Sequence, residues 1–136
     1  MAVKFEFGHV GINAQSPEEG EKMKNFFTEV MGYQNYREIP ASYFTEDNKM
    51  ELMKKMGKGS MGHLSFFVDD MPEAIRYLEG LGYAMDYEHA RYDEDGKTIK
   101  LIFLQDEING FRIHITVKKA PFYVENNAEA LPVVSK

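Results

Sequence analysis

The stretch of sequence that decides the fold is residues 62–70, which read Gly62-His63-Leu64-Ser65-Phe66-Phe67-Val68-Asp69-Asp70. A related stretch lies near the start of the chain, residues 8–14, which read Gly8-His9-Val10-Gly11-Ile12-Asn13-Ala14. Each opens a strand pattern with a Gly-His pair and leads through a polar cluster into an amphipathic helix pattern that ends at a Gly-Tyr pair. Two such copies in one chain predict a fold built by duplication of a half-domain.

A helix start follows each of the two strand patterns. Ser16 and Asp70 have side chains that accept hydrogen bonds from the first turn of a helix, and a proline stands in each first turn, where no N–H is needed. In the first copy, apolar residues then recur at the spacing that predicts one apolar helix face. These are Met23, Phe26, Phe27 and Val30.

The predicted elements give the order β-α-β-β-β in residues 4–55 and again in residues 61–119. Strands are expected over residues 4–13, 33–39, 42–45, 49–53, 63–68, 83–92, 98–104 and 111–118. Residues 120–136 fit neither copy, and we expect an irregular C-terminal tail there. We therefore predict an α+β fold, in which one domain over residues 1–136 contains two tandem βαβββ modules. Two curved mixed sheets of four strands, each with one helix on its convex face, would surround a concave cup.

Composition narrows the class of protein. A chain of 136 residues with 43% hydrophobic and 28% charged residues matches an ordinary soluble domain that can bury a core. The net charge of −6 without a basic stripe argues against nucleic acid, and no apolar run reaches the roughly 20 residues of a membrane helix. The sequence lacks cysteine, a signal-peptide pattern, a phosphate-binding glycine loop and a serine nucleophile motif. We expect a cytoplasmic protein whose chemistry depends on His, Glu, Arg and Tyr.

Four polar residues interrupt the apolar alternation of the first and last strands of the two copies. They are His9, Glu51, His63 and His114. Alternate residues of a strand share a face, so His63 is expected to share its face with Ser65 and Phe67, and His9 with Phe7. If helices cover the apolar faces, the four polar side chains line the cup. Three imidazoles and a carboxylate suit a divalent zinc, nickel, iron or manganese ion.

Simpler interpretations exist for each of these residues. A lone strand histidine is usually hydrogen-bonded or half exposed, and a lone strand glutamate is usually solvated. The matched positions of His9 and His63, with partners on the last strands, favour the metal site over these interpretations. Arg112 is expected on the face of His114, where it could hold an anionic group of a substrate or form a surface salt bridge. His89 has no counterpart in the first copy and is expected at the surface.

The paired Gly-His modules resemble the vicinal oxygen chelate superfamily, which includes glyoxalase I, extradiol dioxygenases and bleomycin-resistance proteins. The resemblance covers about residues 4–119, with residues 61–68 similar to the start of the second module and residues 106–114 similar to its ending. By this resemblance, His9, Glu51 and His63 fall on positions that carry metal ligands in the glyoxalase I branch. It implies the two-module fold and a metal-dependent isomerase or lyase.

Two departures from the family bear on the activity that the resemblance implies. His114 stands where glyoxalase I and the dioxygenases carry a glutamate, which in glyoxalase I also transfers a proton. Asn13 stands where glyoxalase I tends to have a substrate-binding arginine. Glutathione thioesters are therefore not the first choice of substrate, and Asn13, Phe67 and Arg112 are the candidate substrate contacts.

We therefore expect an enzyme that acts on a small oxygen-chelating substrate through a Lewis-acid metal, with Glu51 as both ligand and base. A three-His dioxygenase is one alternative. A non-catalytic protein that sequesters an apolar or aromatic molecule, as bleomycin-resistance proteins do, is another. We also expect a homodimer in which each site takes His9 and Glu51 from one chain and His63 and His114 from the other.

Overall fold

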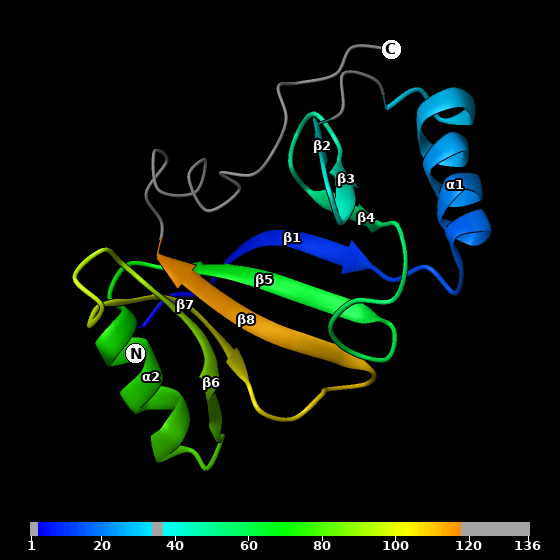
Figure 1. Cartoon of the computed structure of the whole chain (residues 1–136). Helices are drawn as coiled ribbons and strands as arrows, with labels where there is room; N and C mark the ends of the chain where they lie inside the picture. Colours follow the sequence, from blue (N-terminus) through cyan, green and yellow to red (C-terminus); the bar gives the residue numbers. More distant parts are fainter. Residues whose placement is uncertain (1–2, 34–36, 118–136) are drawn as a thin grey trace.

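The computed structural model describes residues 3–33 and 37–117, so the predicted C-terminal tail lies outside the described residues. The fold is α+β, with one curved eight-stranded mixed sheet and helices on its outer side (Figure 1). The first half of the chain forms β1 (Glu6–Ile12), α1 (Pro17–Asn25), η1 (Phe26–Val30), β2 (Arg37–Ile39), β3 (Ser42–Phe44) and β4 (Met50–Met53). The second half forms β5 (Gly62–Val68), α2 (Met71–Gly80), β6 (Met85–Tyr92), β7 (Ile99–Leu104) and β8 (Phe111–Val117).

The two strands that begin with Gly-His pairs lie side by side at the centre of the sheet. The strand order is β2-β3-β4-β1-β5-β8-β7-β6, with β1 and β5 antiparallel, β4 parallel to β1 and β8 parallel to β5. The expectation of two separate four-stranded sheets is therefore wrong. Because β1 and β5 pair directly, their backbone groups satisfy each other and no edge is left between the two halves.

Both helices begin as the sequence predicts. The Ser16 hydroxyl accepts a hydrogen bond of 3.1 Å from the backbone N–H of Glu19, and the Asp70 carboxylate accepts one of 3.0 Å from Glu73. Helix α1 packs beside β4, and α2 packs against β8. No helix among the described residues is long and apolar enough to cross a membrane.

The predicted apolar face of the first helix is only partly correct. The helix changes at Phe26 into the π-helical turn η1, in which the N–H of Met31 bonds to the carbonyl of Phe26 five residues earlier. Because this turn is wider than an α-helical turn, the side chains after Phe26 point in other directions than α-helical spacing predicts. Phe26 and Val30 are consequently exposed, whereas Thr28 is buried.

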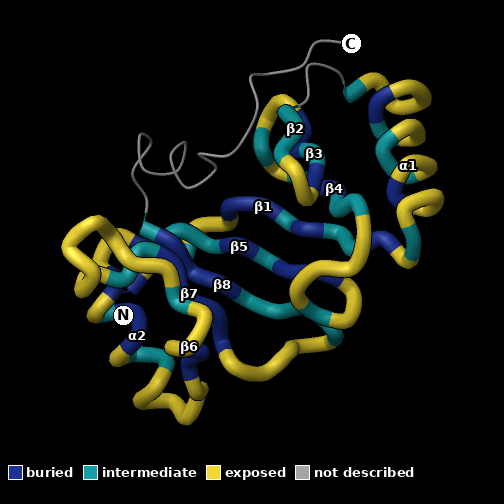
Figure 2. Tube along the Cα trace, in the orientation of Figure 1, coloured by how far each residue is buried: buried dark blue, intermediate teal, exposed yellow. Residues whose placement is uncertain are grey.

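The main apolar core lies between α2 and one face of the second half of the sheet. Ile102 and Ile115 are almost completely buried there and pack with Ala74 and Ile75 of the helix. Because side chains alternate along a strand, Leu101, Phe103 and His114 point to the opposite face. Buried positions concentrate along β1, β5, β8 and β7 in Figure 2, so both faces of the sheet centre are protected from water.

A β-bulge in β1 changes the face of Phe7. Phe7 is opposite Phe66 and His9 is opposite Ser65, so the register shifts by one residue at Gly8. Phe7 therefore contacts the Phe66 ring, with ring centroids 5.9 Å apart, and does not share the face of His9 as expected. The extra residue of a bulge moves each preceding side chain of that strand to the opposite face of the sheet.

Candidate metal centre

A pocket of about 310 Å³ opens on the sheet face that carries His114, and we call it the cup. Strands of both halves contribute to it. Its lining consists of His9, Ile39, Ala41, Phe44, Glu51, Met53, Gly57, Lys58, His63, Ser65, Arg91, Leu101, Phe103, His114 and Thr116. All four predicted metal ligands therefore line one pocket within a single chain.

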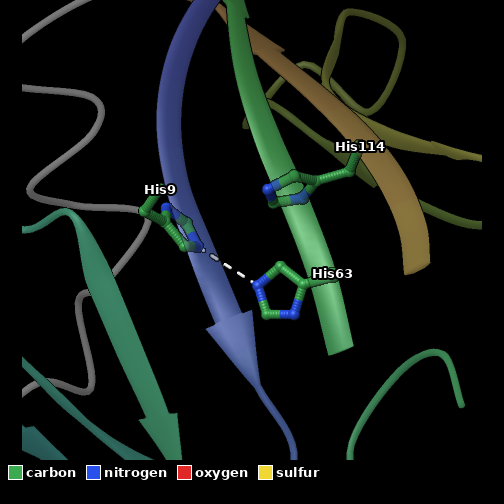
Figure 3. Close-up of side chains that lie close together, drawn as sticks. All are labelled: His9, His63 and His114. Atoms are coloured by element: carbon green, nitrogen blue, oxygen red, sulfur yellow. Dashed lines mark hydrogen bonds between the residues drawn. The ribbon is translucent and has the colours of Figure 1, made fainter. Parts of the chain in front are cut away.

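His9, Glu51 and His63 are in direct contact at the base of the cup. The Nε2 atoms of His9 and His63 are 3.1 Å apart, as the dashed line in Figure 3 shows. The Glu51 Oε1 atom lies 3.3 Å from His9 Nε2 and 3.0 Å from His63 Nε2. Strand pairing explains this meeting, because Gly11 of β1 is opposite both His63 of β5 and Glu51 of β4.

His114 extends from β8 toward the other two histidines (Figure 3). Its ring centroid lies 5.7 Å from that of His9 and 5.4 Å from that of His63, and the three residues each offer a ring nitrogen within 4.8 Å of the others. Neither ring nitrogen of His114 has a hydrogen-bond partner among the described residues, although the side chain is buried. An unpaired buried polar group is costly, so these nitrogens point to a missing partner.

The donor atoms fit a transition-metal ion. Metal bonds of about 2.0–2.2 Å to nitrogen and oxygen hold ligand atoms about 3.0–3.5 Å apart around one ion. The three distances among His9, His63 and Glu51 fall in this range. His9, His63 and His114 could hold a metal ion, and Glu51 adds a carboxylate oxygen at the same spacing.

Burial and hydrogen bonds shift the pKa values of His9, His114 and Glu51. Burial lowers the pKa of His9 more than its hydrogen bond with Glu51 raises it, and burial also holds the pKa of His114 well below the usual range. Burial raises the pKa of the Glu51 carboxyl, but the hydrogen bonds from His63 and His9 outweigh it and leave the pKa well below its usual value. Neutral imidazoles and an ionised carboxylate are the forms that bind metals.

Ser42 holds the second oxygen of Glu51. Its hydroxyl donates a hydrogen bond of 2.6 Å to Glu51 Oε2, and the serine is completely buried. Ser42 reaches this position because β3 is antiparallel to β4 and Ser42 is opposite Met53, two residues from Glu51. One carboxylate oxygen is thus fixed by the hydroxyl, while the other faces the histidines.

The three candidate substrate contacts lie outside the lining of the cup. Arg112 donates from Nη2 to the Asp86 carboxylate at 3.0 Å and from Nε to the Leu104 carbonyl at 3.1 Å. The Asn13 side-chain amide bonds to backbone groups of residues 57–59, which connect β4 to β5. Phe67 is opposite Glu6 in the strand pairing. Arg112 and Asn13 therefore have structural partners in this chain.

Several residues of the site were not singled out from the sequence. They are Phe44, Lys58, Arg91 and Phe103, which line the cup, and Ser42, which is bonded to Glu51. The alternation of residues 99–104 contains a signal for Phe103, because it shares a face with Leu101. Lys58 and Arg91 carry no local signal, since their approach to the cup depends on how distant segments pack. His89 is exposed as predicted, and its Nδ1 lies 2.9 Å from an Asp86 oxygen.

Comparisons with known proteins show a shared fold. No protein-family model matches the chain, and no curated protein matches it. The chain is similar in structure to the hypothetical protein BH1468 from Bacillus halodurans C-125, with a TM-score of 0.55 and 17% sequence identity. The likeness covers 88% of this chain and 96% of that protein. At this identity it supports the architecture and carries no information on activity.

Proposed function

We propose that the chain is a metal-dependent enzyme of the isomerase or lyase type, related to glyoxalases and the vicinal oxygen chelate superfamily. In this proposal its two halves are tandem βαβββ modules around the cup. The observation that carries the proposal is the contact of His9, His63 and Glu51 at metal-ligand spacing, with the unpaired ring nitrogens of His114 beside them. The substrate would be a small molecule with two neighbouring oxygens.

A divalent ion bound here would act as a Lewis acid toward an oxygen of the substrate. His9, His63 and His114 would hold the ion through their ring nitrogens. Glu51 is ionised at neutral pH, and its Oε1 atom would have to leave the ion before it could accept a proton from a carbon next to a carbonyl group. Ser42 would keep the carboxylate in one orientation through Oε2.

Two other functions have support from particular observations. The three buried histidines favour a three-His dioxygenase, because imidazole also suits iron. The aromatic rings of Phe44 and Phe103 in the cup favour a protein that sequesters an apolar or aromatic molecule. The dioxygenase and the sequestering protein would both bind a small molecule. We propose a cytoplasmic location for the protein.

Metal content tests the proposed function. Purified protein, reloaded with zinc, nickel, iron or manganese and dialysed, should retain stoichiometric metal by plasma mass spectrometry. His63→Ala and His114→Ala should lose most of it, whereas His89→Ala, which alters an exposed histidine, should retain it. Wild-type protein that retains no metal would remove the enzyme proposal and favour the binding protein. Metal-loaded protein would then be screened against small oxo- and hydroxy-acids, with proton exchange at carbon as the readout.

A further inference from the structure

The charged residues that line the cup are Glu51, Lys58 and Arg91. Glu51 is already in contact with His9, His63 and Ser42. Within residues 3–33 and 37–117, neither Lys58 nor Arg91 has a carboxylate at ion-pair distance. The chain has 22 acidic residues against 16 basic ones, so two unpaired cations at one pocket are not a consequence of overall charge.

The two cations approach the cup from different segments. Lys58 lies between β4 and β5, and the Asn13 side chain fixes this segment by bonding to Gly57, Lys58 and Gly59 backbone groups. Arg91 lies on β6 opposite Leu101, which also lines the cup. Two sequence segments that are far apart thus direct positive charge toward the same space.

Phe103 lies between Lys58 and the histidine cluster. The Lys58 Nζ atom lies 5.7 Å from the centroid of the Phe103 ring, and that ring lies 4.8 Å from the centroid of the His114 ring. The positive charge of Arg91 also contributes to the lowered pKa of His114, after burial and the two other histidines. The cup therefore has a donor cluster at its base, an apolar wall and a cationic side.

We propose that the ligand of the cup is a small acid with two separate polar ends, and this proposal rests on the proposed function. Neighbouring oxygens at one end would face the histidines and Glu51, and a second anionic group at the other end would pair with Arg91 and Lys58. The distal group would be a carboxylate or a phosphate-like group, since both accept charge-assisted hydrogen bonds from these side chains. Leu101 and Phe103 would contact the carbon chain between them.

Matched 2-oxo acids test this proposal by calorimetry. 2-Oxoglutarate and 2-oxopentanoate have the same five-carbon chain and the same chelating end, but only the former has a distal carboxylate. Metal-loaded protein should bind 2-oxoglutarate about tenfold more tightly, a typical effect of a charge-assisted hydrogen bond, and the preference should shrink in about 1 M NaCl. 2-Oxo-4-phosphonobutanoate, measured in parallel, shows whether the distal site favours a phosphonate over a carboxylate.

Variants assign the preference to the two cations. Arg91→Gln and Lys58→Gln should each remove most of the preference, because the affinity for 2-oxoglutarate should fall much more than the affinity for 2-oxopentanoate. Arg76→Gln and Lys55→Gln are matched controls, because Arg76 and Lys55 are exposed and lie outside the cup, and they should keep it. Thermal melting of all four variants checks that they are folded.

The outcomes separate this proposal from the proposed function. Equal affinity for the two 2-oxo acids, or no binding of either, would overturn the distal anion site even if the protein holds stoichiometric metal. A preference that survives in Arg91→Gln and Lys58→Gln would also overturn it. If the protein holds no metal, the proposed function fails. A preference for 2-oxoglutarate that depends on Arg91 in the metal-free protein would then still support the anion site.

Discussion

Gly11 of β1 lies directly opposite His63 of β5, and a Cβ atom at position 11 would overlap the His63 imidazole ring. The glycine therefore provides the space in which the ring turns toward Glu51 and His9. Gly11 thus contributes to the site itself, because it leaves room for the His63 ring.

Gly11→Ala should displace the His63 ring and weaken metal binding. Loss of ligand orientation commonly reduces metal affinity about 10- to 100-fold, and we expect a loss of this size in competition titrations with a chromogenic chelator. Gly80→Ala is the control, since a Cβ atom there meets no other atom within 4 Å and Gly80 lies at the end of α2. Unchanged metal affinity in Gly11→Ala would contradict the assigned position of the His63 ring.

Two buried serines, one bonded to Glu51 and one lining the cup, differ in their partners and form a matched pair. Ser42 donates to Glu51, whereas the Ser65 hydroxyl has no partner among the described residues. Ser42→Ala should lower the free energy of unfolding of the metal-free protein by about 1.5–3 kcal/mol, because it removes a hydrogen bond to a buried charge. Ser65→Ala should cost much less. Guanidinium unfolding curves measure both, and equal losses would argue against a role for Ser42 in holding Glu51.

Acid should destabilise the metal-free protein. The pKa values of His9 and His114 are lowered in the folded state, so the unfolded chain binds more protons as the pH falls below 6.5. Stability therefore decreases on acidification, by at most about 1.4 kcal/mol per pH unit for each histidine. The depressed pKa of Glu51 adds a further loss below its ordinary value of 4.5.

The pH dependence can be assigned with His114→Gln. This variant should have a flatter dependence of unfolding free energy between pH 5 and pH 6.5 than the wild-type protein, with both measured in the presence of a chelator. A slope that is the same in both proteins would mean that His114 is protonated equally in the folded and unfolded chains.

The meeting of the candidate ligands could be predicted from the sequence because their main signals are local. The repeated Gly-His pair places His9 and His63 at equivalent strand positions, and single polar residues in apolar strands mark Glu51 and His114. Because alternate side chains of a strand lie on one face of the sheet, these residues all point to the same side. The capping residues Ser16 and Asp70 were also predictable, because a cap bonds within three residues of itself.

The features that the sequence did not reveal depend on irregular backbone or on distant packing. The bulge at Gly8 reverses the face of Phe7, and the π-helical turn exposes Phe26 and Val30. Arg112 was expected to hold an anionic group or to form a surface salt bridge. It forms a salt bridge, but a largely buried one, with Asp86 of a strand at the edge of the sheet. Such pairings cannot be read from spacing within one segment.

We expect the protein to form a homodimer in solution. Light scattering at micromolar concentration should then give twice the chain mass of 15.7 kDa, and a monomer mass would contradict this. A mixture of His9→Ala and His63→Ala, denatured and refolded together, tests whether sites are shared between chains. Since all four candidate ligands meet within one chain, we expect the mixture to bind no more metal than its components. Restored binding would support sites shared between chains.

Glu51→Gln distinguishes an enzyme from a binding protein. Glutamine keeps the size of the side chain and an oxygen donor, but it has no negative charge and almost no basicity. Metal affinity should therefore fall moderately, since His9, His63 and His114 remain. Turnover should fall further, by about 10²–10⁴-fold, which is the usual contribution of a general base.

Metal occupancy and turnover should be measured on the same preparations of Glu51→Gln, with the exposed His89→Gln as the control. We expect metal-loaded Glu51→Gln to bind the substrate but to lose proton exchange at carbon, while His89→Gln retains both. Full activity in the metal-loaded variant would remove Glu51 as the base and leave Lewis-acid action alone. Ligand binding that is the same in Glu51→Gln and wild type, without turnover in either, would favour a sequestering protein, because sequestration requires the cup but no proton acceptor.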